Sequence, residues 1–476
     1  MSKKSFYITT TIPYVNAEPH IGFALEIVHA DIVARYKKLI GYEVFFNTGT
    51  DEHGVKVFRK AAELGKETQA YVDESAQKYK ALLPVLGISP EVNFIRTTDP
   101  HHVKAAQAFW KKCLAAGDIY QKNYQIKYCV GCELEKTDSE LVNGHCPLHP
   151  HTALEIIDEE NYFFRLSKYQ ERLLALYDAN PDFVIPAFRL NEIRSLIAEK
   201  GLEDFSVSRV KAKMPWGVPV PNDETQVMYV WFDAFVNYIS AIGWPTDLEK
   251  FERWWPVVQF AGKDQVRQQA VMWQAMLMSA GLPASKQIVI HGFITSGGEK
   301  ISKSLGNVVD PVAIVVEYGT DALRYYLARH IHPFEDSDFT MEKFKEAYNA
   351  NLANGLGNLV SRIMKLAEVY LPGPVKIPED TIPQDFKDAL DSYDSKEAAD
   401  VVWNFIRSLD ERIQKTEPFK LVKTDKDKAI ELIQGLTVDL YTVARMLNPI
   451  LPETMEKIKK AVKENKMPST SLFPRK

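Results

Sequence analysis

The first third of the chain alternates between short apolar runs and longer stretches with helical periodicity. Residues 6–11 are mostly β-branched and aromatic, which predicts a buried strand. Pro13 and Pro19 interrupt the chain, and a helix is predicted after them because apolar residues recur at helical spacing. This stripe consists of Ile21, Leu25, Val28, Ile32, Tyr36 and Leu39. Gly41 is expected to end the helix, and residues 43–48 predict a second strand.

The same alternation returns much later in the chain. Residues 257–262 and 287–290 predict strands, and residues 266–280 predict the helix between them. Alternating strands and helices indicate an α/β fold with a doubly wound parallel sheet and right-handed crossovers. We therefore expect a sheet domain in two halves, 1–115 and 226–291, split by a loop-rich insertion at 116–225. A segment at 292–345 follows, and strand patterns then give way to an all-α domain at 346–476.

Length and composition bound the class of protein. A chain of 476 residues is too long for one ordinary core, so two to four domains are expected. Hydrophobic content of 46% and charged content of 25% are typical of a soluble globular enzyme. We find neither a signal peptide nor a run of about 18 apolar residues, so we expect a cytoplasmic protein without a membrane span. The net charge of −5 does not exclude RNA binding, because an acidic enzyme can bind RNA locally.

Two loops that follow predicted strands carry residues suited to phosphate chemistry. Ligands of parallel sheets bind at the carboxyl ends of strands, where helix N-termini attract anions. His20 could donate a hydrogen bond to phosphate there, and Gly22 would let a nucleotide approach the backbone. The alternative is a helix-capping histidine with a packing glycine.

The second loop follows the strand at 287–290. It contains two glycines, then Lys300 and Lys303 with neighbouring serines, which would make a mobile clamp for a polyphosphate. The alternative is a solvated basic turn.

Three of the four cysteines lie close together in the predicted insertion. Cys129-x-x-Cys132 and Cys146-x-x-His149 each present two ligands to one ion, and four nitrogen and sulfur ligands suit tetrahedral zinc. With all four positions filled by protein, the Zn²⁺ would be structural. Chance spacing is the alternative, and His145 and His151 are competing ligands whose spacing fits less well. Cys113 lies outside the set and is predicted to be a core thiol.

Pro-His-Ile-Gly at 19–22 and Lys-Ile-Ser-Lys-Ser at 300–304 resemble the two signatures of class I aminoacyl-tRNA synthetases. The similarity covers nearly the whole chain and is closest to the methionyl-tRNA synthetases. Further matching stretches are 47–54, 201–209, 216–221, 229–234 and 262–264. The resemblance implies a Rossmann-type catalytic domain, a connective insertion with a zinc knuckle, and an α-helical anticodon-binding domain. It also implies that the protein activates L-methionine with ATP and transfers it to the 3′-terminal ribose of methionine tRNA.

The resemblance also implies roles for individual residues. His20, Lys300 and Lys303 would act on the phosphates during catalysis. ATP, accompanied by Mg²⁺, would be bound by Pro13, His20, Gly22, Gly262, Asp264, His291, Gly292 and Lys303. The methionine pocket would be lined by Ile12, Tyr14, Asp51, Trp231, Ala234, Phe235, Tyr238 and Gln269, with Asp51 on the ammonium group. Thioethers pack well against aromatic edges, although an aromatic run such as the one at 231–232 can equally be ordinary core.

The predicted helical domain carries a stripe suited to RNA. Asn354, Asn358 and Arg362 recur every four residues and so share one helix face. The resemblance implies that this face binds the CAU anticodon, with Phe419 where the family usually has a stacking tryptophan. A polar helix surface is the alternative. The chain leaves no room for the appended dimerising domain of some relatives, so we expect a monomer.

Two departures from the family pattern keep other functions open. Phe23 replaces the second histidine of the first signature, and Gln269 replaces a pocket histidine beside Gln265 and Gln268. One alternative is therefore a class I synthetase of different amino-acid specificity. The other is a non-catalytic tRNA-binding paralogue, which the presence of both loop lysines disfavours.

The insertion separates methionine from several other amino acids. Leucyl, isoleucyl and valyl enzymes need a large editing domain, because one methylene discriminates by only about 1–3 kcal/mol. The insertion at 116–225 has no room for such a domain. Cysteinyl enzymes place their zinc inside the amino-acid pocket, whereas this knuckle belongs to the insertion.

Overall fold

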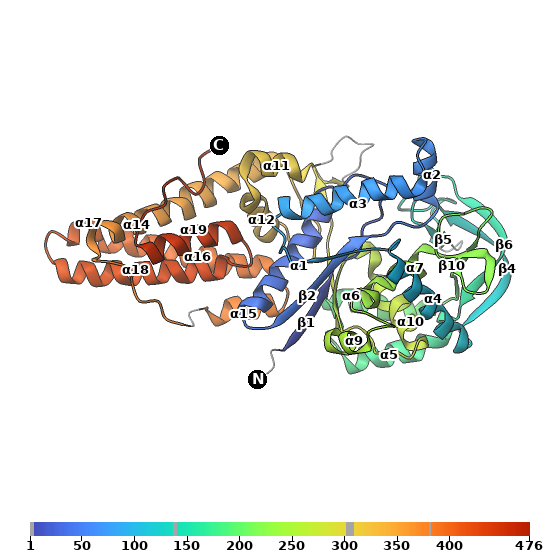
Figure 1. The fold of residues 1–476 in the computed structure, drawn as a ribbon. Helices are drawn as coiled ribbons and strands as arrows, with labels where there is room; N and C mark the ends of the chain where they lie inside the picture. The colour runs from blue at the N-terminus through green and yellow to red at the C-terminus, as the bar shows by residue number, and fades with distance from the viewer. Residues whose placement is uncertain (1–3, 137–139, 301–308, 380–381) are drawn as a thin grey trace.

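A computed structural model describes residues 4–136, 140–300, 309–379 and 382–476. Its centre is a six-stranded parallel sheet, which confirms the predicted doubly wound α/β fold (Figure 1). The strands lie in the order β3 (Asn93–Arg96), β2 (Glu43–Thr50), β1 (Ser5–Thr9), β12 (Val258–Gly262), β13 (Gln287–His291) and β7 (Val184–Ile185). The chain winds outward in opposite directions from β1 and β12. This switch point is where open α/β sheets bind ligands, outside the carboxyl ends of the strands.

The first strand and helix show why the sequence folds this way. Phe6 and Ile8 of β1 point into one hydrophobic core and Tyr7 points into the other, as the two-residue period of a strand requires. Helix α1 (Ile21–Leu39) buries almost its whole length against the first core. It ends before Gly41, whose φ of 96° is costly for other residues.

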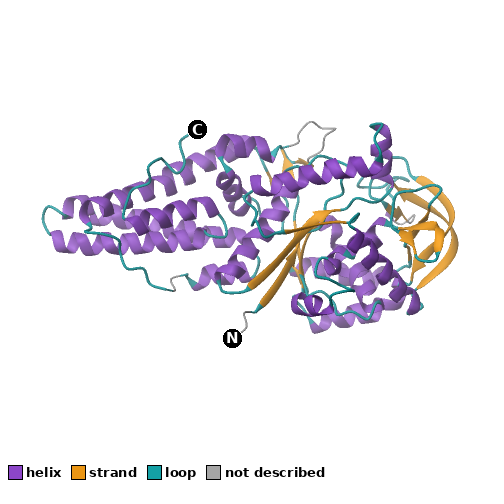
Figure 2. Ribbon diagram, viewed as in Figure 1, coloured by secondary structure: helices purple, strands orange, loops and turns teal. Residues whose placement is uncertain are grey.

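The segment at 116–225 builds most of its structure away from the central sheet. Strands β5 (Leu134–Lys136), β4 (Ile119–Cys129), β6 (Glu155–Phe164) and β8 (Phe205–Ser206) form one antiparallel sheet in that order. A second small sheet contains β10 (Pro219–Val220), β11 (Asp223–Met228) and β9 (Ser208–Val210). Strand β7 of the same segment nevertheless pairs with β13 and extends the central sheet. Figure 2 shows the long curved strands at the end of the molecule opposite the helical bundle.

The predicted helix at 266–280 is not uniform. Gln268–Met272 form a π-helical turn, and the α-helix α10 (Trp273–Ser279) follows it. π-helical turns within helices are rare and are frequent at functional sites. This turn carries Gln268 and Gln269, two of the residues that depart from the family pattern.

Helices dominate the last third of the molecule. Helices α14 (Asn358–Tyr370), α16 (Ser395–Thr416), α18 (Lys426–Leu447) and α19 (Pro452–Glu464) form an elongated bundle (Figure 1). Helix α12 (Thr320–Arg329) packs on both α1 and α16, so one continuous hydrophobic core joins the bundle to the central sheet. None of the helices in the described ranges is both long and apolar enough to cross a membrane.

Candidate functional site

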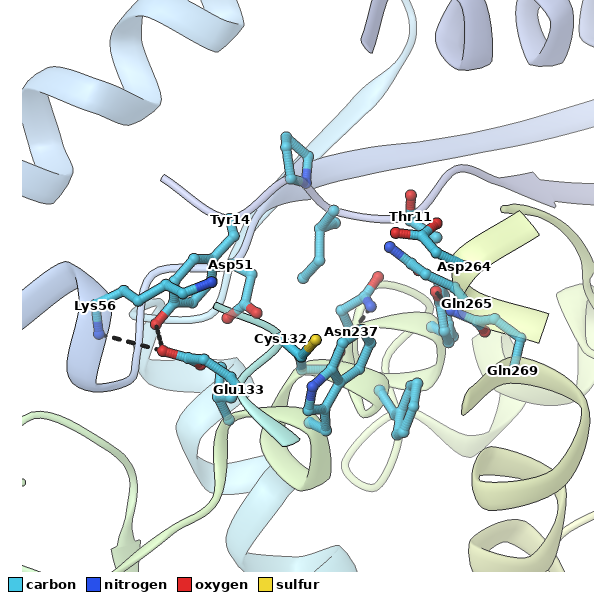
Figure 3. A pocket seen from close by; sticks show the side chains of 17 residues that line it. Thr11, Tyr14, Asp51, Lys56, Cys132, Glu133, Asn237, Asp264, Gln265 and Gln269 are labelled. Carbon is cyan, nitrogen blue, oxygen red and sulfur yellow. Dashed lines mark hydrogen bonds between the residues drawn. The ribbon is translucent and has the colours of Figure 1, made fainter. Parts of the chain in front are cut away.

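A cavity of about 260 Å³ opens beside the carboxyl ends of β1 and β2. It is lined by all eight residues predicted to bind the amino acid, which are Ile12, Tyr14, Asp51, Trp231, Ala234, Phe235, Tyr238 and Gln269. Ile12 and Tyr14 come from the loop after β1, and Asp51 follows β2. Helices α7 (Val230–Phe235) and α8 (Asn237–Ser240) supply the next four, and the π-helical turn supplies Gln269. Figure 3 shows these elements converging on one space.

Asp51 presents an unsatisfied acceptor to this cavity. A backbone bridge pairs Tyr14 with Asp51 and holds the two side by side. The Asp51 side chain is buried, and its Oδ1 has no hydrogen-bond partner within the described part of the chain. Burial raises the pKa of the Asp51 carboxyl well above its usual range, and the nearby Asp233 carboxylate raises it further. A cationic ligand would supply the partner that Asp51 lacks.

Asp233 behaves differently because its partners are in place. The carboxylate is fully buried, and Nδ1 of His53 lies 2.8 Å from Oδ2. Nε2 of His102 lies 3.0 Å from Oδ1. Burial alone would raise the pKa of the Asp233 carboxyl, but the two imidazoles outweigh it and hold the pKa below its usual value. Asp51 is thus the carboxylate with capacity for a new partner.

Gln269 holds one wall of the cavity. Its Nε2 donates to the Tyr238 hydroxyl at 2.8 Å, and its Oε1 accepts from Nε2 of Gln259 at 3.1 Å. The glutamine that replaces the expected histidine therefore positions Tyr238. Because both ends of the Gln269 amide are used inside the protein, its contribution to the cavity is mainly steric.

The edge predicted to bind ATP lies next to the cavity. Pro13 and Asp264 line the cavity themselves. Gly262 ends β12 and His291 ends β13, and the two residues are paired across these neighbouring strands. Both therefore lie at the carboxyl edge of the sheet. Nε2 of His291 donates to Oε2 of the Glu26 carboxylate, on α1, at 2.8 Å. Burial alone would lower the pKa of His291, but Glu26 raises it above the usual value.

His20 is the N-cap of α1. Its Nδ1 accepts a hydrogen bond from the Gly22 N–H at 3.0 Å, so a neutral ring carries its proton on Nε2. A Cβ on Gly22 would stand 2.8 Å from Cε1 of His20. A larger residue at position 22 would therefore clash with the histidine ring. Similarly, a Cβ on Gly292 would stand 2.2 Å from the Glu335 backbone. Capping and packing thus account for these two glycines, and the cap places the His20 ring at the N-terminus of α1, where a helix attracts anions.

The segment that leads to the lysine loop starts at the same edge. Strand β14 (Ile294–Ser296) pairs with β15 (Glu299–Lys300), which places the Lys300 backbone beside Thr295. Lys303 lies outside the described residues. The described part of the segment that carries the predicted clamp runs from Gly292 through β14 and β15 to Lys300.

Cys129, Cys132, Cys146 and His149 form a group able to hold a metal ion. Their ligand atoms all lie within 4.8 Å of one another. Sγ of Cys132 lies 3.4 Å from Sγ of Cys146 and 3.2 Å from Nδ1 of His149. A Cβ on Gly131 would stand 2.3 Å from the His149 ring, so a glycine is needed for the turn to close around the ligands. Cys113 is buried and separate, as predicted, and burial raises the pKa of its thiol to about 12.

The predicted RNA-binding residues lie on the bundle. Asn358 and Arg362 belong to α14, while Asn354 lies on the π-helical stretch Tyr348–Gly357 that precedes it. Asn354 and Asn358 are exposed and line a surface hollow together with residues of the C-terminal tail. Arg475 of that tail donates Nε to Oδ1 of Asn354 at 2.7 Å. Arg362 forms an ion pair with Asp410 of α16.

Phe419 lies beyond the end of α16. It belongs to the short helix α17 (Pro418–Leu421), and 46% of its surface is exposed. A large aromatic ring that is left half in solvent is available for stacking.

Comparison with known proteins identifies the group to which this architecture belongs. The family model of class I tRNA synthetases (M) matches residues 6–155 and 149–364. The methionine–tRNA ligase of Thermotoga maritima is 42% identical over 485 residues, which cover 98% of this chain and 76% of the relative. That of Thermosynechococcus vestitus is 40% identical, with 95% of this chain and 89% of the relative covered. The chain belongs to the methionyl-tRNA synthetase family.

Solved structures of the family agree with this assignment. The Mycobacterium tuberculosis methionyl-tRNA synthetase in complex with methionyl-adenylate superposes with a TM-score of 0.91 at 36% identity, covering 99% of this chain and 100% of that one. The apo form of the same enzyme gives a TM-score of 0.84 at 32% identity, covering 100% of this chain and 99% of that one. Of these two, the adenylate complex is the more similar to the backbone described above.

The replacement of the second histidine in the first signature has a local structural explanation. Phe23, which replaces the second signature histidine, packs edge-on against Tyr79 of α3 (Thr68–Val85), with ring centroids 5.2 Å apart. The phenylalanine therefore serves packing between two helices.

Sequence reasoning missed several residues of the cavity. Lys56 of α2 (Val55–Glu63) and Glu133 of the metal-binding segment both line it. Neither belongs to a matched signature. The only signal in the sequence was the position of Glu133 directly after the metal ligand Cys132.

Proposed function

We propose that this chain forms methionyl-adenylate from L-methionine and ATP, releases pyrophosphate, and transfers the methionyl group to methionine tRNA. Membership of the methionyl-tRNA synthetase family supports the reaction, with relatives named methionine–tRNA ligase matching 95% or more of this chain. The structural similarity to a relative bound to methionyl-adenylate supports the first step.

The observation that carries the assignment of the amino-acid site is an Asp51 oxygen that lacks a hydrogen-bond partner among the described residues. It lies in a cavity that is lined in part by the aromatic residues Tyr14, Trp231, Phe235 and Tyr238. An amino-acid ammonium group would complete the hydrogen bonding of Asp51, and the same charge would stabilise its ionised form. The apolar walls from Ile12, Trp231, Ala234 and Phe235 suit an uncharged side chain. A thioether gains further from sulfur–aromatic contacts with Trp231 and Tyr14.

The nucleotide would lie along the edge formed by Pro13, Gly262, Asp264 and His291. A methionine carboxylate oxygen attacks the α-phosphorus of ATP in line, and the bond to pyrophosphate breaks. His20, Lys300 and Lys303 would stabilise the phosphate oxygens, and the Mg²⁺ that accompanies ATP would supply further positive charge. Catalysis by positioning and by charge stabilisation requires no covalent enzyme intermediate.

The Cys129, Cys132, Cys146 and His149 group fits Zn²⁺. Three thiolates and one imidazole would fill a tetrahedral shell. Three of the separations between their ligand atoms are 3.2–3.8 Å, and all of them are within 4.8 Å, as expected around one ion. Such a closed site would stabilise the fold of the knuckle and leave no position for substrate.

The tRNA would span the molecule from the bundle to the cavity. Asn354, Asn358 and Arg362 supply donors and acceptors for unstacked anticodon bases, and Phe419 supplies a stacking surface. The boundaries we propose are catalytic halves at 1–115 and 226–291, a connective insertion at 116–225, the lysine-loop segment at 292–345, and an anticodon-binding domain at 346–476. We further expect the protein to act as a monomer in the cytoplasm.

Amino-acid-dependent ATP–pyrophosphate exchange tests the function. The purified, zinc-loaded protein would be assayed without tRNA against each of the twenty amino acids. Exchange with methionine alone is the expected result. Exchange with another amino acid would establish a different specificity and direct attention to Gln265, Gln268 and Gln269. A folded protein that exchanges with none of them and charges no tRNA would be a non-catalytic paralogue.

A further inference from the structure

Glu133 joins the metal-binding knuckle to the amino-acid cavity. It directly follows the ligand Cys132 and is 96% buried, with 4% of its surface exposed. Its φ of 51° lies in the left-handed region, which is uncommon for a residue with a side chain. A buried carboxylate and an unfavourable backbone conformation both cost free energy, so the surrounding structure must hold this residue in place.

The contacts of Glu133 show what holds it. Its Oε1 accepts hydrogen bonds from the Tyr14 hydroxyl at 2.9 Å and from the Lys56 N–H at 3.2 Å. Nζ of Lys56 donates to the Gly131 carbonyl at 2.5 Å, and the Tyr229 hydroxyl donates to the Glu133 carbonyl. Figure 3 shows the carboxylate between Lys56 and Tyr14, beside Cys132. The knuckle is therefore tied to the loop after β1 and to the start of α2.

Tyr14 connects Glu133 to the cavity proposed to bind the substrate. Its ring lines the cavity, and the backbone bridge to Asp51 places it beside the carboxylate proposed to bind the ammonium group. The Tyr14 hydroxyl points away from the cavity centre to Glu133 (Figure 3). A Cβ on Gly54 would stand only 2.3 Å from that hydroxyl oxygen, so the glycine keeps open the space in which the bond forms. One hydrogen bond thus fixes the outer end of a ring whose face borders the ligand.

We propose that Glu133 is a positioning residue that makes methionine affinity depend on the folded metal knuckle, by holding the Tyr14 ring in its binding orientation. Residues 129–133 keep their turn only while the knuckle is closed, because the segment is short and its two cysteines are ligands. Loss of the metal would release the turn, carry Glu133 away and leave the Tyr14 hydroxyl without its partner. This inference rests on the proposed function, since it assumes that methionine occupies the cavity.

Glu133→Ala and Tyr14→Phe test the link from its two ends. Methionine binding without ATP would be followed through the fluorescence change of the tryptophans, since Trp231 lines the cavity. Each variant is expected to raise the Kd for methionine about tenfold or more, the range for losing a hydrogen bond to a charged group. The KM for ATP and the zinc content should stay within about twofold of the wild type. The double variant should bind methionine about as weakly as either single variant, because both remove the same bond.

Glu155→Ala is the matched control. Glu155 also connects the insertion to α2, through Arg59 at 2.8 Å, but this pair is exposed and lies outside the cavity. Its removal should leave the methionine Kd unchanged. Glu133→Gln, which keeps an acceptor for Tyr14, should restore most of the affinity lost in Glu133→Ala. If Glu133→Ala does not fold, Tyr14→Phe and Glu133→Gln still measure the contact.

Metal removal supplies the second arm of the experiment. Chelation of the wild-type protein should raise the methionine Kd by a factor similar to that of Glu133→Ala, and chelation of Glu133→Ala should add little. Independent, multiplying effects of Glu133→Ala and Tyr14→Phe would overturn the proposal. So would an effect of Glu155→Ala equal to that of Glu133→Ala. Wild-type protein that binds no methionine would instead refute the proposed function, which keeps the two failures distinct.

Discussion

Arg324 and Asp31 form a fully buried ion pair that ties the helical bundle to the central sheet. Nη2 of Arg324 lies 2.8 Å from Oδ2 of Asp31, and neither side chain has exposed surface. Arg324 lies on α12, and Asp31 lies on α1. The same guanidinium donates to the carbonyls of Ile450 and Pro449, between α18 and α19, and to that of Leu86 after α3. One side chain therefore satisfies backbone carbonyls from two parts of the chain and a carboxylate from a third.

Replacing Arg324 by alanine is expected to destabilise the protein strongly. The substitution leaves the Asp31 carboxylate buried without one of its cationic partners and several carbonyls without donors, which costs about 3–5 kcal/mol. Urea unfolding followed by circular dichroism would measure the loss. Lys38→Ala removes the exposed pair with Glu91 and should cost about 1 kcal/mol or less. Equal effects of the two substitutions would show that Arg324 does not hold the interface.

Asp51 should make methionine binding pH-dependent. The ionised carboxylate is the form that attracts an ammonium group, and burial raises the pKa of Asp51 in the free protein. Methionine affinity is therefore expected to fall as the pH is lowered through that raised pKa, at values where an exposed aspartate with a pKa near 3.9 would stay ionised. Calorimetric titrations between about pH 8 and pH 5 would measure the profile. ATP affinity over the same range is the control.

The Asp51→Asn variant separates this effect from general acid sensitivity. It removes the charge, so the methionine Kd should rise at least tenfold at neutral pH and lose its dependence on pH. The ionisation of Asp51 has the opposite effect on the stability of the folded protein. A carboxyl whose pKa is raised by folding favours the folded state when protonated and disfavours it as the pH rises through that pKa. Asp51→Asn should therefore unfold at an equal or higher temperature than the wild type at neutral pH. An unchanged methionine Kd would remove Asp51 from the binding site.

Gly131 should control metal affinity through the ring of His149. Its missing Cβ would stand 2.3 Å from Cγ of that ligand, so Gly131→Ala must displace the ring or the turn. Zinc affinity, measured by competition with a coloured chelator, is expected to fall tenfold or more, as it does when groups that orient metal ligands are disturbed. Gly435→Ala is the control, because its Cβ would meet no heavy atom within 4 Å. Wild-type affinity in Gly131→Ala would mean that the four ligands do not bind one ion in this arrangement.

The sequence was most informative where a short segment by itself determines the secondary structure. The period-2 and period-3.6 patterns located β1 and α1 because each element buries one face against a core. The predicted cavity residues converge because they lie after strand ends, on helices α7 and α8, and on the π-helical turn, which the parallel sheet brings together. Glu133 and Lys56 escaped prediction since only the folding of the insertion over the cavity makes them neighbours. Strand β7, with two residues, is too short to leave a pattern, and the π-helical turn at Gln268–Met272 depends on tertiary contacts such as those of Gln269.

Phe419 should contribute to tRNA binding without affecting methionine activation. The ring is 46% exposed at the end of the bundle remote from the cavity (Figure 1), so its removal disturbs little of the core. Base–aromatic stacking contributes about 1–3 kcal/mol, and Phe419→Ala is therefore expected to raise the KM for methionine tRNA about tenfold. Pyrophosphate exchange with methionine should stay at the wild-type rate.

Phe419→Trp and Phe188→Ala complete that experiment. Tryptophan offers a larger stacking surface and an N–H donor, so Phe419→Trp should lower the KM for tRNA below that of the wild type. Phe188 of α6 (Ala187–Lys200) is a phenylalanine of similar exposure, 42%, in the insertion, and its replacement by alanine controls for the loss of an exposed ring. Charging of tRNA variants with a changed anticodon should be impaired already in the wild type and change little further in Phe419→Ala. If Phe419→Ala charged methionine tRNA with an unchanged KM, the anticodon would be bound on a different face of the bundle.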